Sequence, residues 1–215
     1  MPIVHSSSLF SPLNQCDQDF SIEIDEDHVY APQLKTTWQG PLVSNVITAK
    51  RSGLTKPELM QHISEQGIED FHWNWETIIL GAPNGSQYDR KTFYLISNRR
   101  IQGVLHAFFP KPSKISIGSR LVYVDRVAVA PWNRNAYHLD KELKGVGSTL
   151  IKYVCSFSKS EGYGGCVGLH SLPQAESFYT RIGMSCLGED ADYDSLKYFE
   201  FTSQVGISFA SGEVA

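Results

Sequence analysis

One stretch, residues 121–162, constrains the fold of this 215-residue chain more than any other. It opens with Leu121 to Ala130, a run rich in β-branched residues that is typical of a strand buried on both faces. Pro131 cannot donate to a ladder, so the strand is predicted to end there. After a polar loop and Gly145-Val146-Gly147, apolar residues recur at helical spacing, and Gly162 follows where a left-handed cap is common. The stretch therefore predicts a strand, a glycine-containing loop and a helix.

The glycine loop is a candidate anion site. A loop that opens a helix presents free backbone N–H groups and the positive end of the helix dipole, and the usual anion there is a phosphate or pyrophosphate. Two glycines alone are a weak signal, because the sequence matches neither GxxxxGK[ST] nor GxGxxG. The alternative is a turn that needs glycine only for its backbone dihedrals.

A second motif narrows the interpretation. Val-Ala-Val-Ala-Pro followed by Gly-x-Gly at the start of a helix resembles the acyl-CoA-binding motif of the GCN5-related N-acetyltransferase (GNAT) superfamily. The segment Phe178-Tyr179-Thr180-Arg181-Ile182-Gly183-Met184 is similar to that superfamily's Phe-Tyr-x-x-x-Gly-Phe ending. The motifs occur in the expected order, with one predicted strand at Cys166 to His170 between them. The resemblance spans Phe93 to Thr202 and points to an uncharacterised branch with a long pyrophosphate-loop insertion.

The resemblance implies an α/β fold with a mixed, mostly antiparallel twisted sheet flanked by helices. The strands at 121–130 and 166–170 would splay apart. Residues 41–204 would form a single acetyltransferase domain. They would follow a poorly defined N-terminal extension at 1–40 and precede a loose C-terminal tail at 205–215.

The implied activity is acetyl transfer from acetyl-CoA to a primary amine, by direct attack in a ternary complex. Two alternatives stay open: an acyltransferase that uses a longer acyl-CoA, and a non-catalytic acyl-CoA-binding sensor. A toxin that acetylates aminoacyl-tRNA is a further possibility, but the net charge of −4 supplies no basic face for nucleic acid. The resemblance leaves the amine unidentified and both a monomer and a homodimer open.

The donor would be held mainly by backbone groups. The resemblance places the pyrophosphate on Lys144, Gly145, Val146, Gly147, Ser148 and Thr149, and the pantetheine arm beside Val127, Ala128 and Val129. One departure stands out: Glu142 lies where relatives carry Arg or Gln, and a carboxylate would repel a pyrophosphate. Lys144, Lys141 or Arg134 could supply the positive charge instead.

Acetyl transfer also needs an acid for the leaving thiolate and a base for the amine. Tyr179 matches the tyrosine that often serves as the acid in the superfamily; the alternative is a packing residue. Asp125, His170 and Glu76 are candidate bases. An apolar strand would raise the pKa of Asp125, unless it pairs with a neighbour such as Arg126. His170 has the appropriate ordinary pKa, but such a residue is more often a cap or a surface residue.

The acceptor site is the least constrained part. In the superfamily the first two helices flank it, so Trp73 and Trp75 could line a substrate pocket, although aromatic residues of this kind more often anchor a core. His72 is more typical of a structural histidine.

Composition excludes several other classes. Cys16, Cys155, Cys166 and Cys186 are scattered without zinc-site spacing, so no metal is expected and the thiols are predicted to be buried and free. The first residues lack the features of a signal peptide, and no apolar run is long enough for a membrane span. We expect a cytoplasmic protein.

Periodicity predicts the remaining elements. We expect strands at Phe20 to Ile24 (an edge strand), Leu42 to Ala49, Thr92 to Ser97, Ile101 to Phe109, Met184 to Leu187 and Leu196 to Thr202. We expect helices after Thr55 (with Thr55 as N-cap and Glu58 at N3, ending near Gly67), over Phe71 to Leu80, and after Pro173 (ending at Gly183). Asn98-Arg99-Arg100 is expected to form the hairpin turn between two of the strands.

Overall fold

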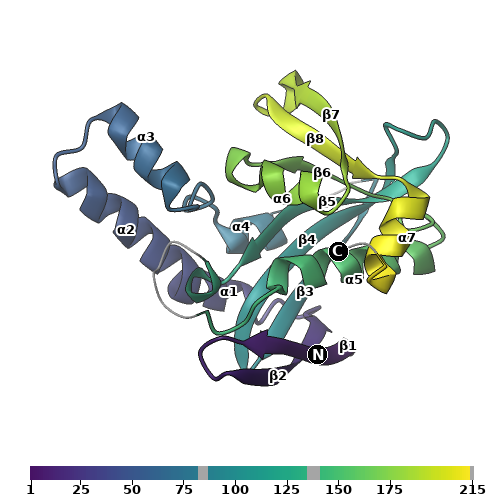
Figure 1. Ribbon diagram of the computed structural model, residues 1–215, viewed down its shortest axis with the longest axis horizontal. Helices are drawn as coiled ribbons and strands as arrows, with labels where there is room; N and C mark the ends of the chain where they lie inside the picture. The colour runs from purple at the N-terminus through teal and green to yellow at the C-terminus, as the bar shows by residue number, and fades with distance from the viewer. Residues whose placement is uncertain (82–86, 135–140, 214–215) are drawn as a thin grey trace. The chain divides into compact units, whose positions relative to one another are not determined.

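Eight strands form one hydrogen-bonded sheet in the order β1-β2-β3-β4-β5-β6-β8-β7 (Figure 1). The computed structural model describes residues 1–81, 87–134 and 141–213. The strands are β1 (Ile3–Ser11), β2 (Cys16–Ile24), β3 (Asp89–Ser97), β4 (Arg100–Pro112), β5 (Arg120–Val129), β6 (Val167–Ser171), β7 (Ser185–Asp190) and β8 (Leu196–Phe201). β5 and β6 are parallel, whereas β1/β2, β6/β8 and β7/β8 are antiparallel. This confirms the predicted α/β class with a mixed, mostly antiparallel sheet.

The helices are α1 (Ala31–Leu34), α2 (Gly40–Arg51), α3 (Lys56–Glu65), α4 (Trp75–Leu80), α5 (Val146–Ser160), α6 (Glu176–Arg181) and α7 (Ser203–Ser211). The chain groups into two compact units. The first holds the described parts of Met1–Gly85, Tyr94–Gly103 and Val129–Val146, and the second those of Ser86–Phe93, Val104–Ala128 and Gly147–Ala215. The division falls within strands β3, β4 and β5, a pattern that the predicted boundaries at 41 and 204 did not anticipate.

In the first unit, residues 1–40 are more ordered than predicted. β1 and β2 form an antiparallel hairpin in which Ser7 pairs with Phe20, and Phe20 and Ile22 are buried on alternate positions of β2. β2 is therefore not an edge strand, since β1 lies outside it.

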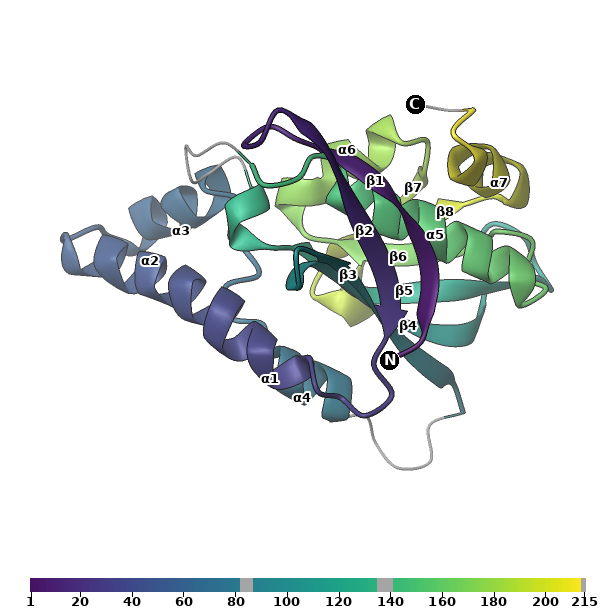
Figure 2. The ribbon, with the colours of Figure 1, turned by 90° about the horizontal axis from the view of Figure 1, so that it is seen from below.

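The predicted strand at Leu42 to Ala49 is wrong, because these residues lie in α2. Leu42, Val46 and Ala49 are buried at helical spacing, and the first two pack with Ile63 and Ile68 in one apolar cluster. α2 and α3 lie side by side in both views (Figures 1 and 2). Packing on one helical face has outweighed the strand propensity of the β-branched residues.

The other predictions in this unit hold at least in part. Thr55 begins α3 with the predicted capping box, in which its N–H donates to Glu58 Oε2 at 2.8 Å. α4 is shorter than predicted because the side chain of Asn74 caps it, accepting from the Thr77 N–H at 3.2 Å. Asn98 and Arg99 both have positive φ, as the tight turn between β3 and β4 requires.

In the second unit, the apolar face of α5 is buried through Leu150, Ile151 and Val154, which confirms the helix. The predicted loose tail at 205–215 is wrong for residues 205–211, which lie in α7. The Phe209 ring is 2% exposed and stacks on Phe201 of β8 at 5.4 Å between centroids. This aromatic contact adds apolar burial that holds the short helix against β8.

Candidate functional site

The parallel strands β5 and β6 pair over only part of their length. Their ladder joins Val122 to Val167, Tyr123 to Gly168 and Val124 to Leu169. β5 continues for five more residues, and its burial falls at the same point, since Val124 is buried whereas Asp125 and Val127 are partly exposed. The edge of β5 that faced β6 is thus released at Asp125, which is the predicted splay.

The strand, loop and helix predicted around the glycines are present. Gly145 has a φ of +82°, a conformation that disfavours any side chain, and α5 begins at the next residue. Lys144 and Gly145 are exposed, and Gly147, Ser148 and Thr149 are partly exposed in the first turn of α5. The first N–H groups of a helix have no partner within it, so this turn can bind an anion. The middle of the predicted loop insertion, 135–140, lies outside the described residues.

Glu142, the residue that departs from the superfamily pattern, is neutralised within the first unit. Its carboxylate forms an ion pair with Arg100 and accepts a hydrogen bond from the Gln102 side chain at 2.9 Å. The Arg100 guanidinium in turn lies 4.0 Å from the ring centroid of Trp132. A carboxylate paired in this way repels a nearby phosphate far less than a free one would.

Arg134, predicted as a donor-binding cation, is fully committed elsewhere. Its two terminal nitrogens bind the carboxylate of Asp70 at 2.6 and 2.7 Å, and its remaining N–H groups reach the carbonyls of Val129 and Gly67. The two side chains are 9% and 5% exposed. Because all five guanidinium donors are used, Arg134 has none left for a phosphate, and the prediction that it binds the donor is not supported.

Lys144 differs from Arg134, because its side chain is exposed and its ammonium lies 5.9 Å from the ring centroid of Phe10. Its backbone N–H donates to the Phe10 carbonyl at 3.0 Å, which fixes the chain directly before Gly145. Among the predicted cations it is the one placed next to the first turn of α5 in the sequence.

Tyr179 lies in α6 and is 5% exposed. Its ring packs against Phe178 at 5.2 Å and Phe199 at 5.7 Å between centroids. Burial raises the pKa of its phenol above the ordinary value, so the hydroxyl is protonated at neutral pH. That state is the one a general acid needs.

Asp125 is paired with its neighbour Arg126, which is the structural role that the sequence offered as the alternative to a catalytic one. The Arg126 guanidinium donates to the Asp125 carboxylate at 3.1 Å and to the Asp125 backbone carbonyl at 2.6 Å. Burial raises the pKa of Asp125, while Arg126 and Lys111 oppose that shift. The side chain is still 23% exposed, so it faces the open part of β5 as a partly shielded carboxylate.

His170 is the centre of a network whose other members the sequence did not single out. Its Nδ1 lies 2.8 Å from the Tyr123 hydroxyl, and its Nε2 lies 3.1 Å from Asp190 Oδ2. The same carboxylate oxygen accepts from the Lys114 ammonium at 2.5 Å. The imidazole stacks on the Tyr193 ring at 3.8 Å between centroids and is 4% exposed.

The charges in this network act in opposite directions. Burial lowers the pKa of His170, the hydrogen bond and charge of Asp190 oppose the shift, and Lys114 and Lys111 add to it. The bonds from Lys114 and His170 lower the pKa of Asp190 to about 2. An ionised carboxylate only accepts hydrogen bonds, so in neutral His170 the proton is on Nε2 and Nδ1 accepts from Tyr123.

Glu200 fixes the side chains and backbone that lie next to this network. It accepts from the Tyr198 hydroxyl at 2.8 Å and from the Lys114 backbone N–H at 2.9 Å, and it is hydrogen-bonded to Ser113. Tyr198 reaches Glu200 by crossing over Gly168, where a Cβ would come within 2.2 Å of the phenol oxygen. The period-two pattern of Tyr198 and Glu200 on β8 was the available signal for this arrangement.

Tyr179 and His170 lie on opposite faces of the sheet. His170 pairs with Tyr198 across β6 and β8, and Leu169 pairs with Phe199. Successive side chains of a strand alternate in direction, so Phe199 and its neighbour Tyr179 are on the face away from His170. Asp125 and Tyr123 are two residues apart on β5 and share the face of the histidine.

Two buried cysteines are poor nucleophiles. Burial raises the pKa of both Cys155 and Cys166, which keeps them as thiols. Cys16 and Cys186 are exposed, so the prediction of buried thiols holds for half of the set; all four are free.

Trp73 and Trp75 lie edge to face at 5.6 Å between centroids. Trp75 is 3% exposed and Trp73 is partly exposed, so Trp75 is a core residue and only Trp73 presents surface. His72 is exposed, and Glu76 pairs with Lys35 at 3.7 Å on the surface. Neither is positioned as a buried base.

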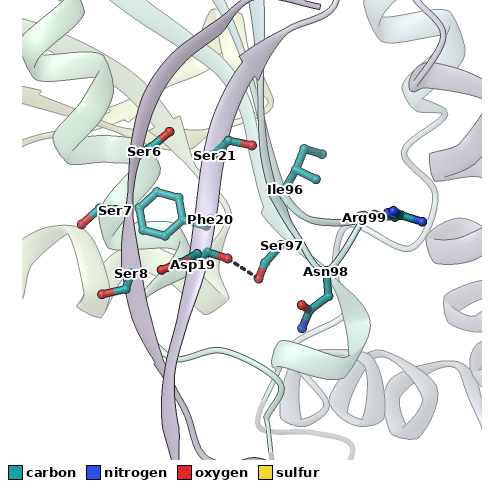
Figure 3. A pocket seen from close by; sticks show the side chains of 10 residues that line it. All are labelled: Ser6, Ser7, Ser8, Asp19, Phe20, Ser21, Ile96, Ser97, Asn98 and Arg99. Atoms are coloured by element: carbon teal, nitrogen blue, oxygen red, sulfur yellow. Dashed lines mark hydrogen bonds between the residues drawn. The ribbon is translucent and has the colours of Figure 1, made fainter.

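A hollow of about 690 Å³ lies in the first unit, and none of the predicted site residues lines it (Figure 3). Its wall is rich in hydroxyl groups, and the Ser97 hydroxyl donates to the Asp19 carbonyl at 2.7 Å across it. The lining residues are Ser6, Ser7, Ser8, Asp19, Phe20, Ser21, Ile96, Ser97, Asn98 and Arg99. Its two charged side chains are exposed, which favours a solvated groove over a catalytic pocket.

Within the described ranges, no group of three or more His, Cys, Asp or Glu side chains is arranged to hold a metal ion. The described helices also include none with the length and apolar character needed to cross a membrane.

No protein-family model and no curated protein matches the chain. Among solved structures it is similar to an acetyltransferase from Thermus thermophilus, at 14% identity over 94% of this chain and 99% of that one, with a TM-score of 0.43. The PaiA N-acetyltransferase of Thermoplasma acidophilum, solved with coenzyme A, shares 15% identity over 84% and 98% of the two chains, with a TM-score of 0.40. A third, named histone acetyltransferase HPA2 and related acetyltransferase, from Corynebacterium glutamicum, shares 14% over 83% and 93%, with a TM-score of 0.45. At these values the resemblance concerns the path of the backbone and assigns no activity to this chain.

Proposed function

We propose that the protein is an N-acetyltransferase that moves the acetyl group of acetyl-CoA to a primary amine. The observation that carries the proposal is the early end of the β5–β6 ladder after Val124, together with the two sequence motifs that resemble GNAT enzymes. An open strand edge offers backbone groups to an extended pantetheine arm, which would lie beside Val127, Ala128 and Val129.

The pyrophosphate would bind the first turn of α5. The free N–H groups of Gly147, Ser148 and Thr149 and the helix dipole favour an anion there, and the hydroxyls of the last two can add hydrogen bonds. Lys144, Gly145 and Val146 precede them directly and extend the same backbone cradle. The pairing of Glu142 with Arg100 removes the main electrostatic objection to this site.

The chemistry would be direct attack. The neutral amine attacks the thioester carbonyl, the C–N bond forms and the C–S bond breaks. The thiolate takes a proton from the Tyr179 hydroxyl, and the proton that the amide nitrogen loses, passed through water, restores the phenol. His170 is the favoured base, because its imidazole is neutral at physiological pH, whereas Asp125 is paired with Arg126. The thiol state of the buried cysteines supports direct attack over an acyl-enzyme.

The test is release of free CoA from acetyl-CoA in the presence of a panel of primary amines: a lysine peptide, a peptide with a free N-terminus, a polyamine and an amine drug. We expect turnover with at least one class. The Tyr179→Phe variant should lose about 100-fold in kcat with unchanged acetyl-CoA affinity. Tyr163→Phe, in the turn after α5, is the matched control and should retain full activity. No acetylated product with any class of amine would contradict the proposal.

A further inference from the structure

We infer that Tyr123, His170 and Asp190 form a relay that removes the proton from the acceptor amine, with Tyr123 as the group that meets the amine, His170 as the base and Asp190 as a positioning residue. The inference rests on the proposed function and adds to it the route of the proton. It starts from a chain of three side chains contributed by β5, β6 and β7.

The geometry gives each member one role. The Asp190 carboxylate lies 3.1 Å from Nε2 and fixes the ring with Nδ1 directed at the Tyr123 hydroxyl, 2.8 Å away. The Tyr193 ring stacks on the imidazole at an interplanar angle of 8° and prevents it from tilting. The histidine is therefore held in one tautomer and one orientation, which is what a base requires before its substrate arrives.

The hydroxyl of Tyr123 is the end of this chain away from Asp190, and the Tyr123 residue is 6% exposed. Asp125 lies two residues further along the same face of β5, about 7 Å away at the rise of an extended strand. It is partly exposed at the position where the β6 ladder has ended. The phenol oxygen can accept a hydrogen bond from an ammonium group, and the Asp125 carboxylate, whose charge is partly offset by Arg126, adds a weaker attraction beside it.

The step balances in protons. The ammonium gives one proton to the Tyr123 oxygen as the Tyr123 hydroxyl gives its own to Nδ1 of His170. The tyrosine is thus unchanged, the amine is neutral, and the imidazolium formed is stabilised by the Asp190 carboxylate. Attack on the thioester then proceeds, and the imidazolium releases its proton to water after the product leaves.

The groups that face His170 come from every element around it. They are Tyr123 from β5, Asp190 from β7, Tyr193 from the turn that follows β7, Tyr198 from β8, and Lys111 and Lys114 from β4 and the segment after it. The two lysines and the aspartate pull the protonation of His170 in opposite directions. Removing the aspartate charge and removing a lysine charge should therefore shift the pKa of His170 in opposite directions.

The experiment is the pH dependence of kcat/KM for wild type and three variants with the best amine. Activity should fall on the acid side as His170 becomes protonated. Asp190→Asn should lower the plateau roughly 10- to 100-fold and move the acid-side midpoint down, because the charge that favours imidazolium is gone. Lys114→Met, at a side chain that is 47% exposed, should move the midpoint up. Glu189→Gln makes the same charge change as Asp190→Asn at the exposed neighbouring position, and it should leave the midpoint in place.

A second readout does not depend on turnover. The ¹⁵N shifts of the His170 ring in the free protein should show the Nε2–H tautomer, and Tyr123→Phe should change the Nδ1 shift and reduce kcat/KM about 100-fold. Proton occupancy on Nδ1 in neutral wild type, or midpoints that move in the same direction in Asp190→Asn and Lys114→Met, would overturn the relay. An active wild type with these results would leave the proposed function standing; a wild type inactive on all amines would instead remove the proposed function.

Discussion

The two units each contain a pairing between a buried basic side chain and an aspartate, and the two pairings differ in whether a member can change its protonation state. In the first unit, every N–H donor of the Arg134 guanidinium is hydrogen-bonded to Asp70 or to one of two backbone carbonyls. In the second, His170 uses one ring nitrogen on Asp190 and directs the other at Tyr123. The first arrangement is saturated and has a fixed charge, whereas the second has a titratable member and ends at the Tyr123 hydroxyl.

The difference separates a structural pair from a candidate catalytic one. A guanidinium does not change protonation at physiological pH, so a saturated Arg–Asp pair can join segments of chain but cannot move a proton. An imidazole of lowered pKa can do so, and its aspartate sets its orientation. Buried charge alone is thus a poor guide to function, and a buried group that can change its protonation state is a better one.

The largest effect that would test this contrast is on stability. Asp70→Ala should lower the free energy of unfolding by about 3–5 kcal/mol, because it leaves the Arg134 charge buried without its partner. Urea denaturation followed by circular dichroism measures it. Asp190→Ala should cost much less, since its side chain is 17% exposed and Lys114 can turn to solvent. Equal losses in the two variants would erase the distinction.

A second prediction concerns pH. Burial holds the pKa of His170 below its ordinary 6.5. Just below pH 6.5, His170 is therefore protonated in the unfolded chain but still neutral in the folded one. The resulting stability is complete above pH 6.5 and declines as the pH falls through the folded pKa. The Asp190 pKa of about 2, below its ordinary 3.8, adds a further loss below pH 4. His170→Gln should remove the upper decline and retain the lower one; an unchanged profile in urea melts from pH 7 to pH 3 would count against the network.

The smallest effect should come from an exposed pair. Lys35 and Glu76 lie 3.7 Å apart with side chains that are 58% and 40% exposed. Glu76→Gln should change the free energy of unfolding by less than about 1 kcal/mol, because water and salt screen such a pair. A loss as large as that expected for Asp70→Ala would show that burial is not what separates these pairs.

The sequence predicted the parts of the fold whose pattern is local. The strand, glycine loop and helix from Leu121 to Gly162, the capping box at Thr55 and the turn at Asn98 follow from residues close in the chain. It failed at α2 and α7, where packing partners decide the structure. The β-branched run of α2 favours a strand until Ile63 and Ile68 supply an apolar surface for one helical face, and α7 depends on Phe201.

The candidate site divides in the same way. Tyr179 and the glycines carry a local motif and could be selected from sequence. Asp190 lies in an acidic turn that offers Glu189, Asp190, Asp192 and Asp194 as equals, and only the pairing of β7, β8 and β6 selects the one that meets His170. Arg134 shows the converse, because no pattern in the sequence reveals that Asp70, 64 residues away, uses its charge.

The most direct test of the account is calorimetric titration of the purified protein with acetyl-CoA, with free CoA as the comparison and with the Gly147→Asp variant alongside wild type. We predict micromolar binding of both ligands to wild type and none to Gly147→Asp, because a carboxylate in the first turn of α5 repels the pyrophosphate. Ser156→Asp, on the exposed side of the same helix, carries the same added charge and should bind normally. Absence of binding to wild type, or full binding to Gly147→Asp, would contradict the assignment of the donor site.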